Sequence, residues 1–311
     1  METKNSLFEE ITSLSTEQIN DNTVNIDLVG TEEILRMINN EDKLVPLAVE
    51  KEIPNIKDAV NIITEALKND GRLIYVGAGT SGRLGVVDAS ECPPTFGTDP
   101  NMIIGIIAGG KDAMFVAQEG AEDNPQGAID DLNKLELSEK DVVVGIAASG
   151  RTPYVKSAVN YAKSVGCSTI MISTSDRNKV LEMGIDADVL ICPNVGPEVI
   201  AGSTRMKSGT AQKLVLNMLT TATMVRLGKT YKNIMVDLQQ TNNKLVERSK
   251  NIIMKICNVD YEQATNLLEK SKGKVKNAIV MKLLNIDYDQ SVKVLVESDG
   301  KIRQAVKDLN S

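Results

Sequence analysis

The sequence predicts an α/β fold, a flavodoxin-like sandwich of three layers in which helices cover about five parallel strands. Three observations support this prediction: short apolar runs recur through the middle of the chain, helical stretches separate them, and the runs are apolar on both faces. Such strands are typical of a parallel sheet buried between helices. The predicted strands are residues 72–76, 102–108, 141–147, 168–172 and 187–191.

The stretches beside these strands have the length and composition of helices. Two adjacent parallel strands need a crossover connection, which is usually a helix. The predicted helices are residues 57–68, 84–90, 113–119, 153–165 and 205–227.

Two flanking regions extend this central domain, to which we assign residues 51–250. Residues 1–50 are polar and rich in Asn and Glu, and residues 32–39 carry apolar positions at the spacing of a helix. They predict an N-terminal helical arm that could be exchanged between subunits.

The region 251–311 contains an internal repeat with an offset of 27 residues, because NVDYEQA at 258–264 returns as NIDYDQS at 285–291. GKVKNA at 273–278 likewise returns as GKIRQA at 300–305. Each copy predicts two short helices, with Asp as the N-cap and Gly as the break. The two copies predict a small all-α domain like a ubiquitin-associated (UBA) domain, with a packing or dimerisation role.

The composition of this 311-residue chain excludes several classes of protein. A net charge of −7 without a concentrated basic face argues against a nucleic-acid partner, although loop amides could still bind a small anion. The N-terminus lacks the basic start and apolar core of a signal peptide, and no apolar run approaches a membrane span. Four scattered cysteines suit reduced thiols. We therefore expect a cytoplasmic protein without a membrane partner.

The chain contains no histidine. This excludes a Ser-His-Asp triad or a Cys-His dyad, and it removes the commonest zinc ligand and proton shuttle. Acid–base chemistry must fall to Glu, Asp, Lys, Tyr or the substrate.

A glycine-rich loop, residues 77–83, follows the first predicted strand and formally matches the dinucleotide fingerprint GxGxxG. A dinucleotide site also needs an acidic residue at the end of the second strand, which here ends IIAGGK at 106–111. The dinucleotide interpretation therefore fails. Gly79, Thr80 and Ser81 instead offer amides and hydroxyls at a helix N-terminus, which suits a terminal phosphate.

A second loop of this kind, with Ser149, Gly150 and Thr152, follows the third strand. The two loops would meet at the carboxyl edge of the sheet, where open α/β sheets bind ligands. A third segment leads into a long helix, and Glu198, Ser203, Thr204 and Lys207 are its candidate ligand-binding residues. The alternative is structural: Ser203 and Thr204 would then be caps and the basic side chains would face solvent.

Five strings in the chain resemble one family of SIS-domain proteins, the N-acetylmuramic acid 6-phosphate etherases. The resemblance runs from about residue 41 to the C-terminus, and its most specific part is ECPPTFG, which generic phosphate binding does not require. Ser203-Thr204 stands where the family also has Ser-Ser. The strings are YVGAGTSGRLG at 75–85, DASECPPTFG at 88–97, EGAED at 119–123, VGIAASGRTPYV at 144–155 and GTAQKLVLNML at 209–219.

The resemblance implies a SIS fold and a carbon–oxygen lyase of amino-sugar catabolism and peptidoglycan recycling. That family cleaves the D-lactyl ether of N-acetylmuramic acid 6-phosphate, giving N-acetylglucosamine 6-phosphate and D-lactate without metal or organic cofactor. The two active-site glutamates of that family correspond to Glu91 and Glu122, with Glu91 as the proton donor. The resemblance also implies a homodimer. On sequence alone either glutamate could be solvated surface, and Glu119 is an equal candidate beside Glu122.

Two other functions remain open. An aldose–ketose isomerase of sugar phosphates would share the fold, the loops and the first proton abstraction, but it would release a ketose instead of lactate. A regulator that senses sugar phosphates would bind without turnover, and its relatives carry a second sugar-binding domain for which this chain has no room.

Overall fold

The computed structural model describes residues 12, 14–239 and 242–308. These residues form two compact units. One consists of residues up to Ser90 together with Asn101–Thr220, and the other of Glu91–Pro100 together with the residues from Thr221 on. We expected no signal peptide mainly from the sequence of residues 1–11. Those residues lie outside the described part of the chain.

The first unit is built on a five-stranded sheet with the order β2-β1-β3-β4-β5. Every pair is parallel, and Leu73 of β1 is in register with Ile103 of β2 and Val142 of β3. The predicted α/β fold is therefore confirmed. The strands are β1 (Leu73–Gly77), β2 (Ile103–Ile107), β3 (Val142–Ile146), β4 (Ser168–Ile172) and β5 (Val189–Ile191).

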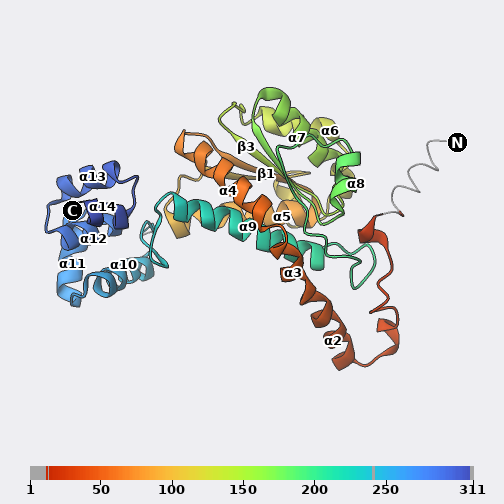
Figure 1. Ribbon diagram of the computed structural model, residues 1–311, viewed down its shortest axis with the longest axis horizontal. Helices are drawn as coiled ribbons and strands as arrows, with labels where there is room; N and C mark the ends of the chain where they lie inside the picture. The colour runs from red at the N-terminus through yellow and green to blue at the C-terminus, as the bar shows by residue number, and fades with distance from the viewer. Residues whose placement is uncertain (1–11, 13, 240–241, 309–311) are drawn as a thin grey trace. The chain divides into compact units, whose positions relative to one another are not determined.

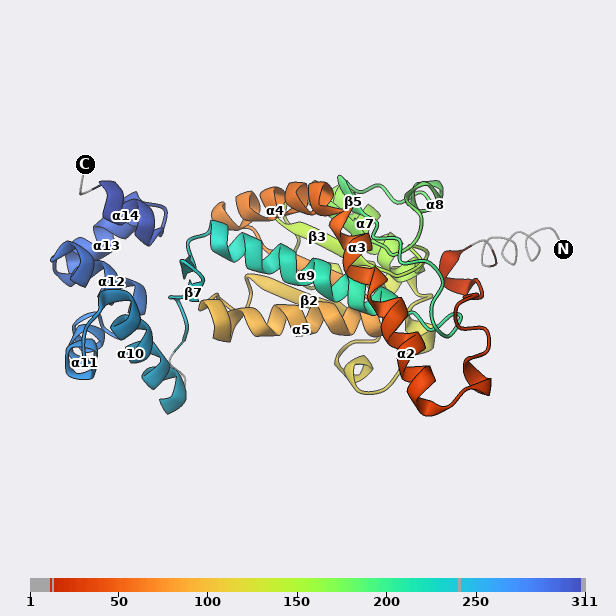
Figure 2. The same cartoon turned by 60° about the horizontal axis from the view of Figure 1, so that its bottom comes forward.

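Helices cover both faces of this sheet (Figures 1 and 2). On one face, Val143 and Met171 belong to an apolar core with Val155 and Val159 of α7. On the other face, Gly85 of α5 lies close to Tyr75. The helices are α4 (Ile53–Lys68), α5 (Gly79–Phe96), α6 (Pro125–Asn133), α7 (Pro153–Val165), α8 (Arg177–Glu182) and α9 (Lys207–Arg226).

The prediction of a helix over 113–119 was wrong. The structure has two short 3₁₀ turns there, η3 (Lys111–Met114) and η4 (Glu119–Ala121). Gly109 and Gly110 precede them at φ 86° and 71°, in a conformation that does not continue into an α-helix. The helix after β2 is α6, which begins at Pro125 behind the capping side chain of Asn124.

Helix α5 is longer than the predicted 84–90. It begins in the glycine loop and continues through Pro93 and Pro94 to Phe96, where Gly97 follows at φ 62°. Pro93 and Pro94 lie inside this helix, although each lacks the amide donor of an i→i−4 hydrogen bond.

The N-terminal arm contains the 3₁₀ turns η1 (Ser15–Glu17) and η2 (Ile26–Leu28) and the helices α2 (Thr31–Asp42) and α3 (Leu44–Glu50). It belongs to the same compact unit as the sheet. Because compactness does not define evolutionary domains, the division into 1–50, 51–250 and 251–311 stays a prediction.

The second unit holds a short hairpin of β6 (Thr230–Tyr231) and β7 (Ile234–Met235), followed by five helices among the described residues. Asp260 and Asp287 cap the first helix of each repeat, and Gly273 and Gly300 separate the helices at φ 79° and 69°, as predicted. Likeness to a UBA domain stays a prediction. The helices are α10 (Asn243–Cys257), α11 (Tyr261–Lys270), α12 (Val275–Leu284), α13 (Tyr288–Glu297) and α14 (Ile302–Asp308).

A search of the described residues for a helix long and apolar enough to cross a membrane found none.

The close approach of α5 to the sheet gives a first testable prediction. A Cβ on Gly105 of β2 would lie 2.6 Å from the Cα of Val86, so backbone would have to move. We expect Gly105→Ala to lower the free energy of unfolding by about 1–3 kcal/mol. Urea unfolding measures this. Gly30→Ala is the control, because nothing lies within 4 Å of that position, and equal stability of the two variants would contradict the prediction.

Candidate functional site

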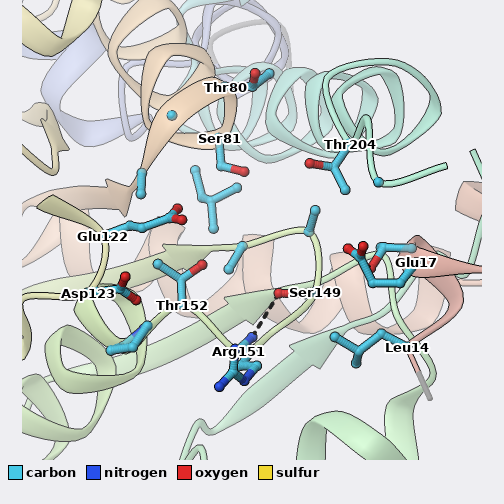
Figure 3. Close-up of a pocket in the computed structure, with 18 residues that line it drawn as sticks. Leu14, Glu17, Thr80, Ser81, Glu122, Asp123, Ser149, Arg151, Thr152 and Thr204 are labelled. Carbon is cyan, nitrogen blue, oxygen red and sulfur yellow. Dashed lines mark hydrogen bonds between the residues drawn. The ribbon is translucent and has the colours of Figure 1, made fainter. Parts of the chain in front are cut away.

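A polar pocket lies at the carboxyl ends of β1 and β3. In this strand order the chain leaves β1 toward β2 on one side and leaves β3 toward β4 on the other, so the pocket between the ends of β1 and β3 occupies the switch point of the sheet. Figure 3 shows its labelled side chains converging from several segments of the chain. All of the lining residues belong to the first compact unit.

The loop after β1 supplies Gly79, Thr80 and Ser81 to the pocket. A Cβ on Gly77 would lie 2.6 Å from the amide nitrogen of Gly82, so the tight turn requires glycine there. The Ser81 hydroxyl donates to Gln212 Oε1 of α9 at 2.9 Å, which orients it beside the N-terminus of α5. The amides of this loop and the Thr80 hydroxyl therefore present donors to an anion.

The loop after β3 supplies Ser149 and Thr152. Gly150 has φ 77° and turns the chain, and the amide of Arg151 donates to Ser149 Oγ at 3.2 Å (Figure 3). Thr152 is the N-cap residue of α7, with Pro153 in its first turn. The pocket thus has a second helix N-terminus with hydroxyls beside it.

Glu122 lines the pocket from the loop between η4 and α6. Its backbone carbonyl accepts a hydrogen bond from the amide of Tyr154 at 3.0 Å, which ties this loop to the start of α7. Figure 3 shows the Glu122 side chain extending from this loop toward the middle of the pocket. The contact explains how a residue distant in sequence from both glycine loops reaches the same site.

The third predicted segment contributes Thr204 to the lining. Glu198 and Lys207 are buried outside the lining. The Glu198 carboxylate accepts from the amides of Lys207 and Ser208, both at 2.9 Å, and so caps the N-terminus of α9. These contacts give both side chains structural partners, and their predicted ligand contacts stay predictions.

Lys207 forms a buried ion pair with Glu41 of α2, with Nζ 2.6 Å from Oε2. The same carboxylate accepts hydrogen bonds from Asn20 at 2.8 Å and Asn22 at 2.9 Å. Burial by itself would raise the pKa of Glu41, but the hydrogen bonds from Lys207 and the two asparagines outweigh it and hold that pKa below its usual value. The pair joins the N-terminal arm to the start of α9.

The predicted site residues thus fall into two groups. Glu91 is exposed on α5 and, like Gly150 and Ser203, is not among the residues that line the pocket. The predicted residues that do line it are Gly79, Thr80, Ser81, Glu122, Ser149, Thr152 and Thr204.

Sequence reasoning missed the part of the N-terminal arm that reaches the pocket. Leu14, Thr16 and Glu17 line one wall, and Asp123 and Arg151 line others. Asp123 and Arg151 stand inside strings already singled out, so their neighbours could have suggested them. Nothing in the sequence of the arm indicates that its 3₁₀ turn would reach the sheet.

No group of three His, Cys, Asp or Glu side chains that could hold a metal ion occurs in the described part of the chain.

Comparison with known proteins gives two family matches. Residues 55–163 match the family "Glucokinase regulatory protein N-terminal SIS domain", and residues 124–222 match the family "SIS domain".

Curated relatives match over most of the chain. An N-acetylmuramic acid 6-phosphate etherase of Salinibacter ruber is 58% identical over 280 residues, covering 90% of this chain and 89% of the relative. One from Oceanobacillus iheyensis is 55% identical, covering 86% and 90%. N-acetylmuramic acid 6-phosphate etherase 2 of Vibrio cholerae is 54% identical, covering 89% of each. A solved phosphoheptose isomerase from Neisseria gonorrhoeae covers 62% of this chain and 98% of its own, with a TM-score of 0.47 and 20% identity.

The buried ion pair gives a second testable prediction. Lys207→Met leaves the Glu41 carboxylate buried without its cation, so we expect the free energy of unfolding to fall by about 3–5 kcal/mol at neutral pH. The double variant Glu41→Gln/Lys207→Met removes both charges and should lose less. Urea unfolding of the wild type and both variants measures this.

The same pair predicts a pH dependence. A carboxylate whose folded pKa is depressed contributes stability above its unfolded pKa, and that contribution is lost as the pH falls through the folded pKa. The stability difference between wild type and Lys207→Met should therefore shrink below about pH 4. A difference that stays constant down to pH 3 would contradict this account.

Proposed function

The chain belongs to the N-acetylmuramic acid 6-phosphate etherase family, and we propose that it cleaves the D-lactyl ether of N-acetylmuramic acid 6-phosphate. The products are N-acetylglucosamine 6-phosphate and D-lactate, which makes the protein a carbon–oxygen lyase of cytoplasmic amino-sugar catabolism and peptidoglycan recycling. The observation that carries this proposal is the pocket, in which hydroxyls at two helix N-termini lie with the Glu122 carboxylate.

The phosphate of the substrate binds between the two glycine loops. Thr80 donates a hydrogen bond from the start of α5, Ser81 donates once its hydroxyl turns from Gln212 to the phosphate, and Ser149 and Thr152 donate from the start of α7. Both helix N-termini favour a dianion through their free amides and their dipoles. Because these contacts are remote from the ether, their binding energy orients C2 and C3 for the reaction.

The reaction is an elimination followed by a hydration. In the open-chain sugar, C3 lies β to the C1 aldehyde, so a base that takes the C2 proton allows the C3–O bond to break with a double bond forming between C2 and C3. A second group protonates the departing lactate oxygen. Water then adds at C3 while C2 regains a proton, so the proton roles reverse and no redox change occurs.

Glu91 and Glu122 carry these proton transfers. A protonated carboxyl group can donate a proton and a carboxylate can accept one, so a pair of glutamates suits both roles. A chain without histidine has few other acid–base groups, and the presence of Glu122 in the pocket supports its role.

The protein acts as a homodimer in which the partner supplies Glu91. Thr80, Leu84, Val87 and Glu91 recur every three or four residues along α5, so they share one face of that helix. Val87 is 41% exposed, an apolar position open to a partner. If two α5 helices pack antiparallel about a two-fold axis, the register in which Leu84 meets Val87 also brings Glu91 to Thr80 at the partner's pocket.

A second apolar feature beside α5 supports this interface. Phe115 is 91% exposed and Val116 is 63% exposed, next to a turn that Arg83 of α5 binds. The Arg83 guanidinium donates to the carbonyls of Ala113 at 2.7 Å and Met114 at 3.0 Å. An exposed aromatic side chain on a held turn is typical of a protein interface.

The activity gives a third testable prediction. Wild-type protein incubated with N-acetylmuramic acid 6-phosphate should release D-lactate, and Glu122→Gln should fold but lose about 10²–10⁴-fold in rate, because it removes one proton-transfer group. An enzymatic D-lactate assay measures both. Asp130→Gln, an exposed change on α6, is the control and should keep the wild-type rate.

The route can be tested in heavy water. Elimination breaks the C2–H bond, so the N-acetylglucosamine 6-phosphate formed should carry deuterium at C2, which mass spectrometry detects. A product free of deuterium would rule out the elimination, and a ketose released from an unsubstituted aldose phosphate would favour an isomerase.

The homodimer gives a fourth testable prediction. Glu91→Gln and Glu122→Gln should each be inactive, but a mixed dimer of the two contains one site in which both glutamates are intact. Mixed dimers isolated by two affinity tags should regain about half of the wild-type rate. Isolated mixed dimers without activity would show that Glu91 does not act on the partner's pocket.

A further inference from the structure

The N-terminal arm forms one wall of the pocket, through Leu14, Thr16 and Glu17. The carbonyl of Thr16 accepts a hydrogen bond from the amide of Gly202 at 3.0 Å. Leu14 and Thr16 are almost fully buried. This wall is therefore packed onto the loop before α9.

Contacts on the C-terminal side of Glu17 hold the arm in the same place. Asn20 donates to the carbonyl of Pro197 at 3.1 Å as well as to Glu41, and the Thr23 hydroxyl donates to the carbonyl of Val199 at 2.9 Å. Glu41 is in turn paired with buried Lys207. The backbone of Glu17 is thus held between two docked stretches of chain.

The Glu17 carboxylate occupies space that Gly202 leaves open. A Cβ on Gly202 would lie 3.3 Å from Glu17 Oε2, and Gly202 has φ 79°, which a larger residue rarely adopts. Within the part of the chain that the structure describes, the other carboxylate oxygen accepts one long hydrogen bond, from the Thr16 hydroxyl at 3.4 Å. The carboxylate therefore keeps acceptor capacity for a ligand.

Figure 3 shows Glu17 and Glu122 on opposite sides of the pocket, with Ser149 and Thr152 between them. A carboxylate accepts hydrogen bonds and repels a phosphate dianion, so Glu17 cannot belong to the part of the pocket that binds the phosphate. The groups of an amino-sugar phosphate that can donate to it are hydroxyls and the acetamido N–H.

We propose that Glu17 is a substrate-orienting residue, whose carboxylate accepts hydrogen bonds from the hydroxyl or acetamido N–H groups of the sugar on the wall opposite Glu122. This inference rests on the proposed function. With the phosphate held by the two loops, a contact on the far wall fixes the rotation of the sugar, and its negative charge turns the lactyl carboxylate of the substrate away from the arm.

The test separates the sugar from its phosphate by measuring calorimetric binding of N-acetylglucosamine 6-phosphate and of inorganic phosphate. Glu17→Ala should weaken sugar-phosphate binding by about 10–100-fold, the effect of a hydrogen bond to a charged group. Glu17→Gln, which keeps the shape and one acceptor, should fall between Glu17→Ala and wild type. Inorganic phosphate should bind both variants as tightly as wild type or more tightly, since a negative charge is gone.

Glu33→Gln is the matched control, because Glu33 is exposed on α2 outside the pocket lining and the variant loses the same charge. It should bind both ligands as the wild type does. In turnover, Glu17→Gln should raise KM more than it lowers kcat.

Three results would overturn the inference: equal loss of affinity for the sugar phosphate and for inorganic phosphate, wild-type affinity in Glu17→Ala, or a wild type that binds the sugar phosphate no more tightly than phosphate. The proposed function is judged separately, by D-lactate release from the wild type. If that release fails, the two binding series still decide whether Glu17 contacts the sugar.

Discussion

The buried ion pair between Lys207 and Glu41 is the interaction on which the shape of the pocket depends. Its ammonium also donates to the carbonyl of Val195 in the loop before α9, and its carboxylate also accepts a hydrogen bond from Asn20 of the arm. Two charges taken out of water are costly unless every partner is in place, so the pair tolerates little displacement of the arm or of α9. Glu198 extends this arrangement by capping α9 at the same residue, Lys207. A structural contact of this kind thereby holds two walls of a ligand site.

The parallel sheet supplies the rest of the pocket. Its strand order leaves a crevice between the ends of β1 and β3, and the helices that follow these strands begin there. Among the described lining residues, the carboxylates of Glu17, Glu122 and Asp123 outnumber the cations, of which Arg151 is the one present. A bound phosphate therefore depends on amides, hydroxyls and helix dipoles more than on positive side chains.

Such a site suits elimination chemistry in a chain without histidine. The anchoring groups are neutral and remain as they are during the reaction, while carboxylates on separate segments are available to exchange protons or to orient the sugar. Glu91 is exposed on α5 and absent from the lining, and the proposed homodimer would account for both its exposure and its absence from the lining.

The sequence by itself determined the parallel sheet, both glycine loops and the repeated Asp caps, because these depend on local patterns: β-branched runs, glycines in tight turns, and short side chains before helices. It also indicated Glu122 by family resemblance. It misjudged residues 113–119 because helical composition there is overruled by Gly109 and Gly110. Only the tertiary structure decided that Lys207 is buried against Glu41 and that Glu17 reaches the pocket, because both contacts join segments well over a hundred residues apart, and no local pattern encodes such a pairing.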